Sequence, residues 1–369
     1  MRIIATSLVA LLLGTGVAAC TSQPEEYVES HQERYYPNRE DWPPPPRVAD
    51  PWKPGDFQNG IQIYWHYNAS DEDIQDKIDN MLDYVVRRHA NSVAITFPIY
   101  TDGVTPTTVY TDAETPTPAQ LSIILAEAKN RNLRVLVRPL IYEMNIVEES
   151  PGDWRGSIDV ADPSQWFDSY INVLQQYVPV AVQYDVDEFV AGTELVSLQS
   201  MTDQWQRVIE TIRAAGFAGE VSYSTNWADE ENVVFSDIGV DAYPGFELGD
   251  DASVDQLTAA ISGWFQSRYS ADELSRLTIQ EAGIPAISGM YLHPWWWGGN
   301  DQPLNVDIQA KWFTAMCNAA HNVGVEGIYY WNLDTNIDFN NEAFDPMTGY
   351  SASFYGRPAE DNIRECFLR

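Results

Sequence analysis

Apolar runs alternate with amphipathic segments along the chain from residue 56 onward. Eight short runs are almost continuously apolar, which is typical of strands buried on both faces. Between most of them, apolar residues recur every three or four positions, as Ile74, Ile78 and Met81 do, and this spacing predicts helices with one buried face. The predicted strands lie at 59–67, 91–100, 133–142, 186–195, 219–227, 237–245, 276–284 and 325–333.

The alternation of strands and helices predicts the fold class. Eight buried strands separated by helical segments are what a (β/α)8 TIM barrel requires. No glycine-rich phosphate-binding loop follows the first strand, which disfavours a doubly wound dinucleotide-binding fold. The connection after the fifth strand is short and poor in helix signals. The predicted helices lie at 71–90, 118–132, 162–178, 202–217, 253–269, 307–324 and 356–368.

The N-terminal 55 residues differ in composition from the rest of the chain. Residues 1–20 combine Arg2, an apolar stretch and a small-residue end, which is typical of a secretory signal peptide. Residues 21–55 are polar and proline-rich, and they predict an extended tether rather than a domain. We therefore expect a single barrel domain over 56–369.

The signal segment ends in VAAC, which resembles a bacterial lipobox. This resemblance implies cleavage before Cys20, a lipid on its thiol, and a membrane-anchored location in the cell envelope. Thr21 stands where an aspartate would retain the protein in the inner membrane, so the outer membrane or cell surface is expected in a Gram-negative cell. A soluble secreted protein with an incidental cysteine is the alternative.

Charge and cysteine content narrow the function classes. The formal net charge of −33 would repel nucleic acid, so we expect no nucleic-acid partner. With Cys20 lipidated, Cys317 and Cys366 remain, and both fall on predicted helices near the end of the chain. An export compartment permits a disulfide between them. Two free buried thiols are the alternative.

Two glutamates close apolar runs on strands that a barrel would place across from each other. Glu194 ends the fourth predicted strand, in AGTEL, and Glu281 ends the seventh, in LTIQEAG. Burying a carboxylate at such a position costs folding free energy, so its presence there indicates a functional role. Active sites in TIM barrels gather at the C-terminal strand ends. We therefore predict that the two carboxyl groups face each other across a sugar-binding cleft and form the acid/base and nucleophile of a retaining glycosidase.

The other strand ends carry aromatic and hydrogen-bonding side chains, the mixture that sugars require. Asp241 competes with Glu281 for the role of nucleophile. Arg138 could instead pair with a neighbouring acid, His66 could be structural, and the aromatic residues could simply pack. The predicted substrate-binding residues at strand ends are Trp65, His66, Arg138, Asn226, Trp227, Asp241, Tyr243 and Trp331.

A loop with three adjacent tryptophans, HPWWW at 293–297, follows the seventh strand. Three such side chains in a polar loop are hard to explain as core, so we predict that Trp295 and Trp296 form a sugar-stacking platform. The acidic residues of the last loop match no EF-hand spacing, and we predict no metal site.

Several of these stretches together resemble glycoside hydrolase clan A. They are AGTEL at 191–195, YSTNW at 223–227, IGVDAY at 238–243 and the glutamate that ends the seventh strand. The pattern is most similar to family 113, over residues 56–335. The resemblance implies a retaining β-1,4-mannanase that needs no cofactor.

The resemblance also implies individual roles. Glu194 would be the general acid/base and Glu281 the nucleophile, with Tyr243 hydrogen-bonded to the nucleophile. Trp331 would form the floor of the −1 subsite, and Asn226 and Trp227 would line the cleft. The chain departs from the common clan pattern at Thr193, where an asparagine usually precedes the acid/base.

We thus expect a lipid-anchored glycoside hydrolase that acts on β-linked polysaccharide or oligosaccharide, most similar to mannan-degrading enzymes. Two alternatives remain open from the sequence. One is a non-catalytic glycan-binding lipoprotein on the same barrel. The other is a clan A β-glucanase or xylanase.

Overall fold

The computed structural model describes residues 45–228, 234–296, 303–337, 339 and 353–369. Residues 45–369 form one compact unit. The predicted signal peptide, the predicted lipidation site Cys20 and most of the predicted tether lie outside the described residues. Within the described part, no helix is both long enough and apolar enough to cross a membrane.

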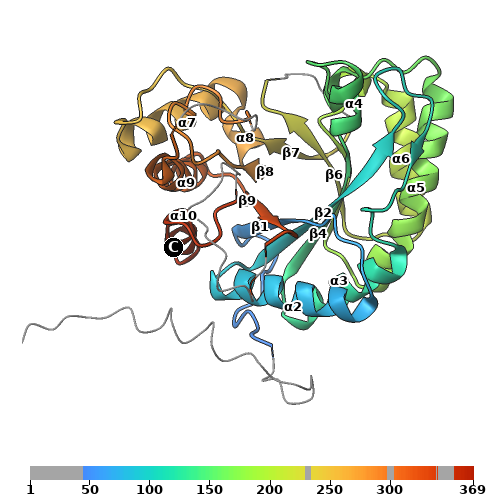
Figure 1. Cartoon of the computed structure of the whole chain (residues 1–369), viewed down its shortest axis with the longest axis horizontal. Coiled ribbons are helices and arrows are strands. Elements are labelled where there is room, and N and C mark those ends of the chain that lie inside the picture. Colours follow the sequence, from blue (N-terminus) through green and yellow to red (C-terminus); the bar gives the residue numbers. More distant parts are fainter. Residues whose placement is uncertain (1–44, 229–233, 297–302, 338, 340–352) are drawn as a thin grey trace, which may run out of the picture. The chain divides into compact units, whose positions relative to one another are not determined.

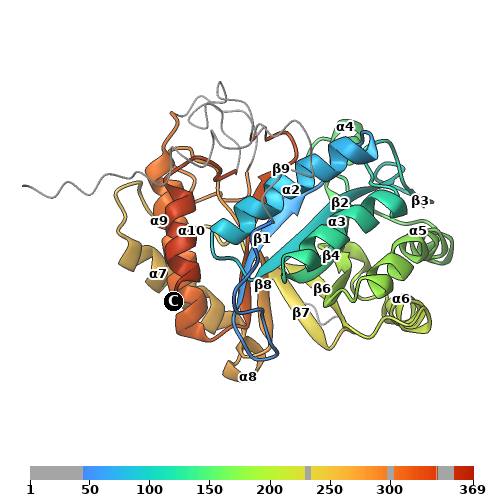
Figure 2. The same ribbon diagram turned by 90° about the horizontal axis from the view of Figure 1, so that it is seen from below.

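Eight parallel strands close into a barrel, which confirms the predicted fold class. Each strand pairs with its neighbour around the ring, and the first pairs in parallel with both the second and the last. Figures 1 and 2 show the helices wrapped around the outside of these strands. The barrel strands are β1 (Gln58–Tyr64), β2 (Ser92–Thr101), β4 (Arg134–Ile141), β5 (Glu188–Thr193), β6 (Glu220–Asn226), β7 (Asp237–Asp241), β8 (Leu277–Ala282) and β9 (Gly327–Asp334).

All seven predicted helices are present. The structure also contains two short helices and a two-residue strand that were not predicted. Side-chain caps from Ser70, Thr117, Asp162 and Ser253 satisfy backbone N–H groups at four helix starts. Strand β3 (Val109–Tyr110) pairs antiparallel with β2. The helices are α2 (Asp71–Arg87), α3 (Pro118–Asn130), α4 (Met144–Glu149), α5 (Pro163–Gln183), α6 (Thr202–Ala214), α7 (Val254–Arg268), α8 (Ala271–Leu274), α9 (Val306–Val323) and α10 (Ala359–Phe367).

Helix α5 runs beyond its predicted end at residue 178. Pro179 lies inside it, although proline removes a backbone hydrogen bond from a helix interior. Val180 and Ala181, which follow, are buried in the layer between helices and strands. Burial of apolar side chains therefore outweighs the local cost of the proline.

The barrel has two cores of different character. The larger core lies between strands and helices and contains most of the buried apolar side chains. Inside the ring, Ala94, Leu136, Val190 and Tyr329 form a small apolar cluster. Gly60 makes room for it, since a Cβ there would lie 2.2 Å from the Tyr329 ring. Polar side chains follow this cluster toward the C-terminal strand ends, where the candidate site lies.

The segment 45–55, predicted as part of the tether, packs against the barrel instead. The Val48 N–H donates to the Arg131 carbonyl at 2.9 Å, and the Arg134 guanidinium lies 4.9 Å from the centre of the Trp52 ring. A cavity of about 830 Å³ lies here, lined in part by Trp52 and Arg134. It is at the N-terminal end of the barrel, opposite the candidate site.

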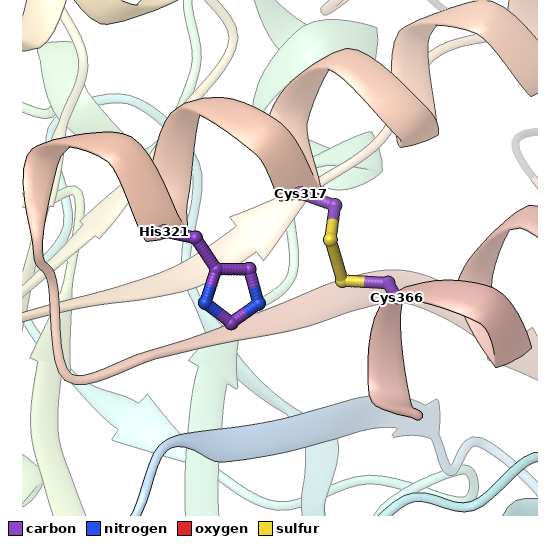
Figure 3. Close-up of side chains that lie close together, drawn as sticks. All are labelled: Cys317, His321 and Cys366. Carbon is purple, nitrogen blue, oxygen red and sulfur yellow. A yellow bond between two sulfur atoms is a disulfide. The ribbon is translucent and has the colours of Figure 1, made fainter. Parts of the chain in front are cut away.

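A disulfide joins the last two long helices. Cys317 on α9 is bonded to Cys366 on α10, with a Cα–Cα distance of 5.9 Å, which confirms the predicted pair (Figure 3). His321 lies beside the bond and stacks on Phe57 with ring centroids 4.3 Å apart. Because both sulfurs belong to the disulfide, neither is a thiolate that could bind a metal in this state.

Candidate active site

The two predicted glutamates lie at the C-terminal end of the barrel. Glu281 is on β8, and Glu194 is the first residue after β5. Their exposed fractions are 5% for Glu194 and 6% for Glu281. Glu194 has a φ of 52°, in the left-handed region that residues other than glycine rarely adopt. Such backbone outliers cluster at functional sites, and this one marks the point where β5 ends.

The Glu194 carboxyl group accepts hydrogen bonds from two different elements. Asn226 Nδ2, at the end of β6, donates to Oε1 at 2.7 Å. Arg155 Nη1, from the loop between β4 and α5, donates to Oε2 at 2.7 Å. The Asn226 amide is oriented by the Ala228 N–H, which donates to its Oδ1 at 2.8 Å. Both oxygens of Glu194 are therefore held by donors.

The Glu281 carboxyl group has its own pair of partners. The Tyr243 hydroxyl donates to Oε2 at 2.7 Å, as the resemblance to family 113 implied. Arg138 Nη2 lies 2.7 Å from Oε1. The hydrogen bond from the Tyr243 hydroxyl and the positive charge of Arg138 both stabilise the ionised form of Glu281.

A buried polar network supports the two glutamates from below. Arg138 Nη2 also pairs with Asp241 Oδ2, and Ser224 Oγ donates to Asp241 Oδ1 at 2.6 Å. Arg138 Nε donates to the Thr193 hydroxyl at 3.1 Å. Arg138 and Asp241 are fully buried, so the prediction that they contact substrate is wrong. They orient Glu281 instead, and Asp241 has no exposed oxygen with which to compete as nucleophile.

Burial sets the ionisation of both glutamates. Burial raises the pKa of Glu281 and the Asp241 charge adds to the rise, Arg138 and the Tyr243 hydrogen bond act against it, and the net pKa is about 7. Burial also raises the pKa of Glu194 well above its ordinary value, again with the help of Asp241. Arg155 acts in the opposite direction on Glu194. Both carboxyl groups are thus poised for proton transfer nearer neutral pH than an exposed glutamate.

Aromatic side chains flank the glutamates. Trp227 packs against Tyr243, with ring centroids 5.5 Å apart, and against Trp295 at 5.3 Å. Trp295 and Trp296 are 36% and 43% exposed, as a platform requires. The third tryptophan of that loop, Trp297, lies outside the described residues. The loop after β8 is therefore connected to Glu281 through ring contacts from Trp295 to Trp227 and from Trp227 to Tyr243.

A second aromatic group lies at the ends of β1 and β9. Trp331 is half-buried and packs against Tyr64, with ring centroids 5.5 Å apart. His66 Nε2 lies 3.0 Å from Asp334 Oδ1. Burial lowers the pKa of His66, but the Asp334 hydrogen bond and charge outweigh it and the pKa is raised overall. His66 is therefore paired with a neighbouring acid at the rim of the barrel.

Trp65 is not a site residue, and its prediction as one is wrong. Its side chain is completely buried, and its indole N–H donates to the Tyr67 carbonyl at 3.0 Å. Side chains alternate along a strand, so Trp65 lies on the same face as Ile61 and Ile63, toward the helices. It belongs to the outer core.

Arg155 is the site residue that the strand ends did not reveal. It lies in a 3₁₀ turn, Arg155–Ser157, and its Nε donates to the Ile141 carbonyl at 3.0 Å and lies 3.2 Å from Glu143 Oε1. The surrounding stretch has no strand or helix period that would place it. The one signal was a basic residue in a chain with 21 lysines and arginines against 54 acidic residues.

Solved structures resemble this barrel. A complex of a family 113 β-1,4-mannanase has a TM-score of 0.70 at 22% identity, covering 85% of this chain and 99% of its own. A second structure of a family 113 β-1,4-mannanase has a TM-score of 0.69 at 23% identity, with the same coverage. The family 113 β-mannanase AaManA from Alicyclobacillus acidocaldarius, in complex with ManMIm, has a TM-score of 0.67 at 20% identity, covering 85% and 97%.

Curated proteins offer no significant match to the sequence. The family comparison is decisive, because the model of Glycoside Hydrolase Family 113 matches residues 63–355, which is most of the chain and includes both glutamates. The chain therefore belongs to Glycoside Hydrolase Family 113 and is a glycoside hydrolase.

Proposed function

We propose that this glycoside hydrolase cleaves β-1,4-linked mannan-type polysaccharide or oligosaccharide with retention of configuration. The observation that carries the proposal is the pair of buried glutamates, Glu194 and Glu281, each held by its own donors at the C-terminal end of the barrel. Family membership and the similarity to β-1,4-mannanases support the substrate class.

The reaction would proceed by double displacement. In the first step a Glu281 oxygen attacks the anomeric carbon while Glu194 gives its proton to the leaving glycosidic oxygen, and a covalent glycosyl-enzyme forms. In the second step water attacks the same carbon, its proton passes to Glu194, and the bond to Glu281 breaks. Retaining enzymes need their carboxyl groups about 5–5.5 Å apart, because the nucleophile must reach the carbon directly.

The neighbours of each glutamate fit these roles. Arg138 and Tyr243 stabilise the charged form of Glu281, which a nucleophile requires. Burial raises the pKa of Glu194, which favours the protonated form that a general acid requires. Trp331 would form a floor under the reacting sugar, and Trp227 with Trp295 would stack on the apolar face of a neighbouring ring.

A polysaccharide panel tests the substrate and the acid together. Wild-type protein should release reducing sugar from β-mannan and much less from β-glucan or xylan. Glu194→Gln should abolish this release while binding of manno-oligosaccharides is retained. Glu210→Gln, at an exposed position on α6, is the control and should keep wild-type activity. Preferred cleavage of glucan or xylan would contradict the proposed substrate, and an inactive wild type would contradict the reaction.

We also propose that the enzyme works at the cell envelope. The signal segment and the VAAC sequence ending at Cys20 support a lipid anchor, and residues 21–44 would place the barrel beyond the membrane surface. An envelope-bound hydrolase would act on polysaccharide fragments outside the cytoplasm. The Cys317–Cys366 disulfide suits an oxidising compartment of this kind.

A further inference from the structure

The contact between Arg155 and Glu194 conflicts with the proposed first step. A general acid must carry a proton on the oxygen that faces the glycosidic bond. Oε1 of Glu194 is occupied by Asn226, whose amide orientation the Ala228 N–H fixes. Oε2 is thus the oxygen left to carry the proton, and Arg155 occupies it at 2.7 Å. A guanidinium donates hydrogen bonds but cannot accept one.

The positive charge of Arg155 also disfavours a protonated Glu194. An opposite charge at hydrogen-bond distance favours the ionised form of a carboxyl group. Among the groups that lower the pKa of Glu194, Arg155 has the largest effect, against burial and the acidic neighbours. The charged or titratable groups that face Glu194 from the surrounding elements are Arg138, Glu143, Arg155, Tyr223, Asp241, Tyr243 and Glu281.

Arg155 also has an alternative partner in its own loop. Its Nε lies 3.2 Å from Glu143 Oε1, and the Glu143 side chain is 29% exposed. The Ile141 carbonyl accepts from the same Nε at 3.0 Å. If Nη1 left Glu194, the guanidinium charge would remain balanced by Glu143. The Arg155 side chain is 13% exposed and Arg138 is completely buried, so Arg155 is the less buried of the two arginines that contact the glutamates.

We propose that Arg155 is a displaceable counter-ion of the acid/base: it pairs with Glu194 in the free enzyme and leaves Oε2 when a glycan binds. The inference rests on the proposed function, and it makes Arg155 a positioning residue. Displacement favours the protonated Glu194 that donates to the leaving oxygen. Arg155 stays off Oε2 while the deprotonated Glu194 accepts the proton of water in the second step, and it pairs with Glu194 again once the glycan has left and that proton has passed to solvent.

The pH dependence of turnover tests displacement directly. The basic limb of kcat/KM reports the acid of the free enzyme, and that of kcat reports the acid of the enzyme–substrate complex. In Arg155→Gln, the basic limb of kcat/KM should move up by about one pH unit or more, because a close counter-charge is lost. The basic limb of kcat should stay at its wild-type position, because Arg155 has already left Glu194 in that complex. The substrate should be a manno-oligosaccharide with a sugar leaving group, so that the first step limits kcat.

Two further variants test whether the shift in Arg155→Gln comes from the lost charge at this position. Arg155→Lys keeps the positive charge and should return the kcat/KM profile toward wild type. Arg207→Gln removes an exposed arginine that pairs with Asp168 on the helical layer, and it should change neither profile. Equal shifts of both limbs in Arg155→Gln would mean that Arg155 stays on Glu194 in the complex and would overturn displacement. An unchanged kcat/KM profile would overturn the counter-ion role itself.

A measurement without turnover separates this inference from the proposed function. The side-chain carboxyl carbon of Glu194 can be titrated by ¹³C NMR in the free protein, with Glu194→Gln to assign the signal. Its pKa should be higher in Arg155→Gln than in wild type, and an unchanged pKa would refute the counter-ion role. If no glycan is hydrolysed, the proposed function fails. In that case the titration can be repeated with an unhydrolysed manno-oligosaccharide bound, to test whether Arg155 is displaced. Displacement predicts that binding raises the Glu194 pKa in wild type but not in Arg155→Gln.

Discussion

Two residues of the same type acquire different properties from their neighbours in this site. Glu281 is held by Tyr243 and Arg138 from within the barrel, and Glu194 by Asn226 and a loop arginine. Burial raises the pKa of both, but only Glu281 lies directly on the buried Arg138–Asp241 network. In the proposed mechanism, this difference would give a nucleophile in a fixed position and an acid/base whose arginine partner is less deeply buried.

The hydroxyl of Tyr243 should control the acid limb of activity. It donates to Glu281 and lowers a pKa that burial and Asp241 raise, with about 7 as the net result. Tyr243→Phe removes this donor, so Glu281 should hold its proton to higher pH, and the acid limb of kcat/KM should move up by about half a unit to one unit. Tyr177→Phe removes a buried hydroxyl that donates to the Pro116 carbonyl, and it should leave the limb unchanged. A downward shift in Tyr243→Phe would contradict the assigned hydrogen bond.

Glu281 should also limit stability at neutral pH. Its folded-state pKa of about 7 lies above the ordinary value of 4.5, so the unfolded chain releases a proton first and stability falls as pH rises between these values. Glu281→Gln stays neutral and should be more stable than wild type at pH 7.5, by on the order of 1–3 kcal/mol. Denaturant titration at pH 7.5 and pH 4 measures this, and the gain should vanish at pH 4. An equal gain at both pH values would exclude ionisation as its cause.

At the scale of elements, the sequence was sufficient for the strands and most helix starts. Continuous apolar runs identified all eight barrel strands, and capping residues such as Ser70 and Asp162 begin helices where the period predicted. Trp65 follows the end of β1 on the same face as Ile61 and Ile63, so strand alternation directs its side chain to the outer core and not to the site. The exact end of α5 depended on tertiary burial, which local signals around Pro179 do not contain.

The candidate site was predictable where it uses strand ends and not where it uses loops. Glu194, Glu281 and the Tyr243 hydroxyl end their strands, so barrel closure alone brings them to one end. Arg155 reaches the site from an irregular loop, and no periodic pattern fixes the position of such a residue. The burial of Arg138 beneath Glu281 depends on its inward register on β4, which the sequence left open between substrate contact and ion pairing.

The disulfide between α9 and α10 should stabilise the C-terminal part of the barrel. It joins residues 49 positions apart, so its removal increases the conformational entropy of the unfolded chain. The Cys317→Ser, Cys366→Ser double variant should lose about 2–4 kcal/mol of unfolding free energy while kcat stays near wild type, because the bond is on the helical layer. Wild type treated with reductant is the matched control and should melt like the variant. Unchanged stability in both would contradict a structural role.

At the scale of the whole molecule, the barrel is one part of a longer chain with a proposed anchor. Cys20→Ala should move the protein from the membrane fraction to the soluble exported fraction, because the lipid would be the attachment. Metabolic labelling with a fatty-acid analogue should mark wild type and not the variant, while Cys317→Ser keeps the label. A variant that still sediments with membranes would contradict anchoring through Cys20.

Trapping the covalent intermediate would identify the nucleophile and the double-displacement route at once. The protein would be incubated with a 2-deoxy-2-fluoro-β-mannosyl fluoride, and the labelled peptide located by mass spectrometry. We expect one added sugar on Glu281 and slow release of the label in buffer. A label on Asp241, or continued turnover without any adduct, would contradict this expectation.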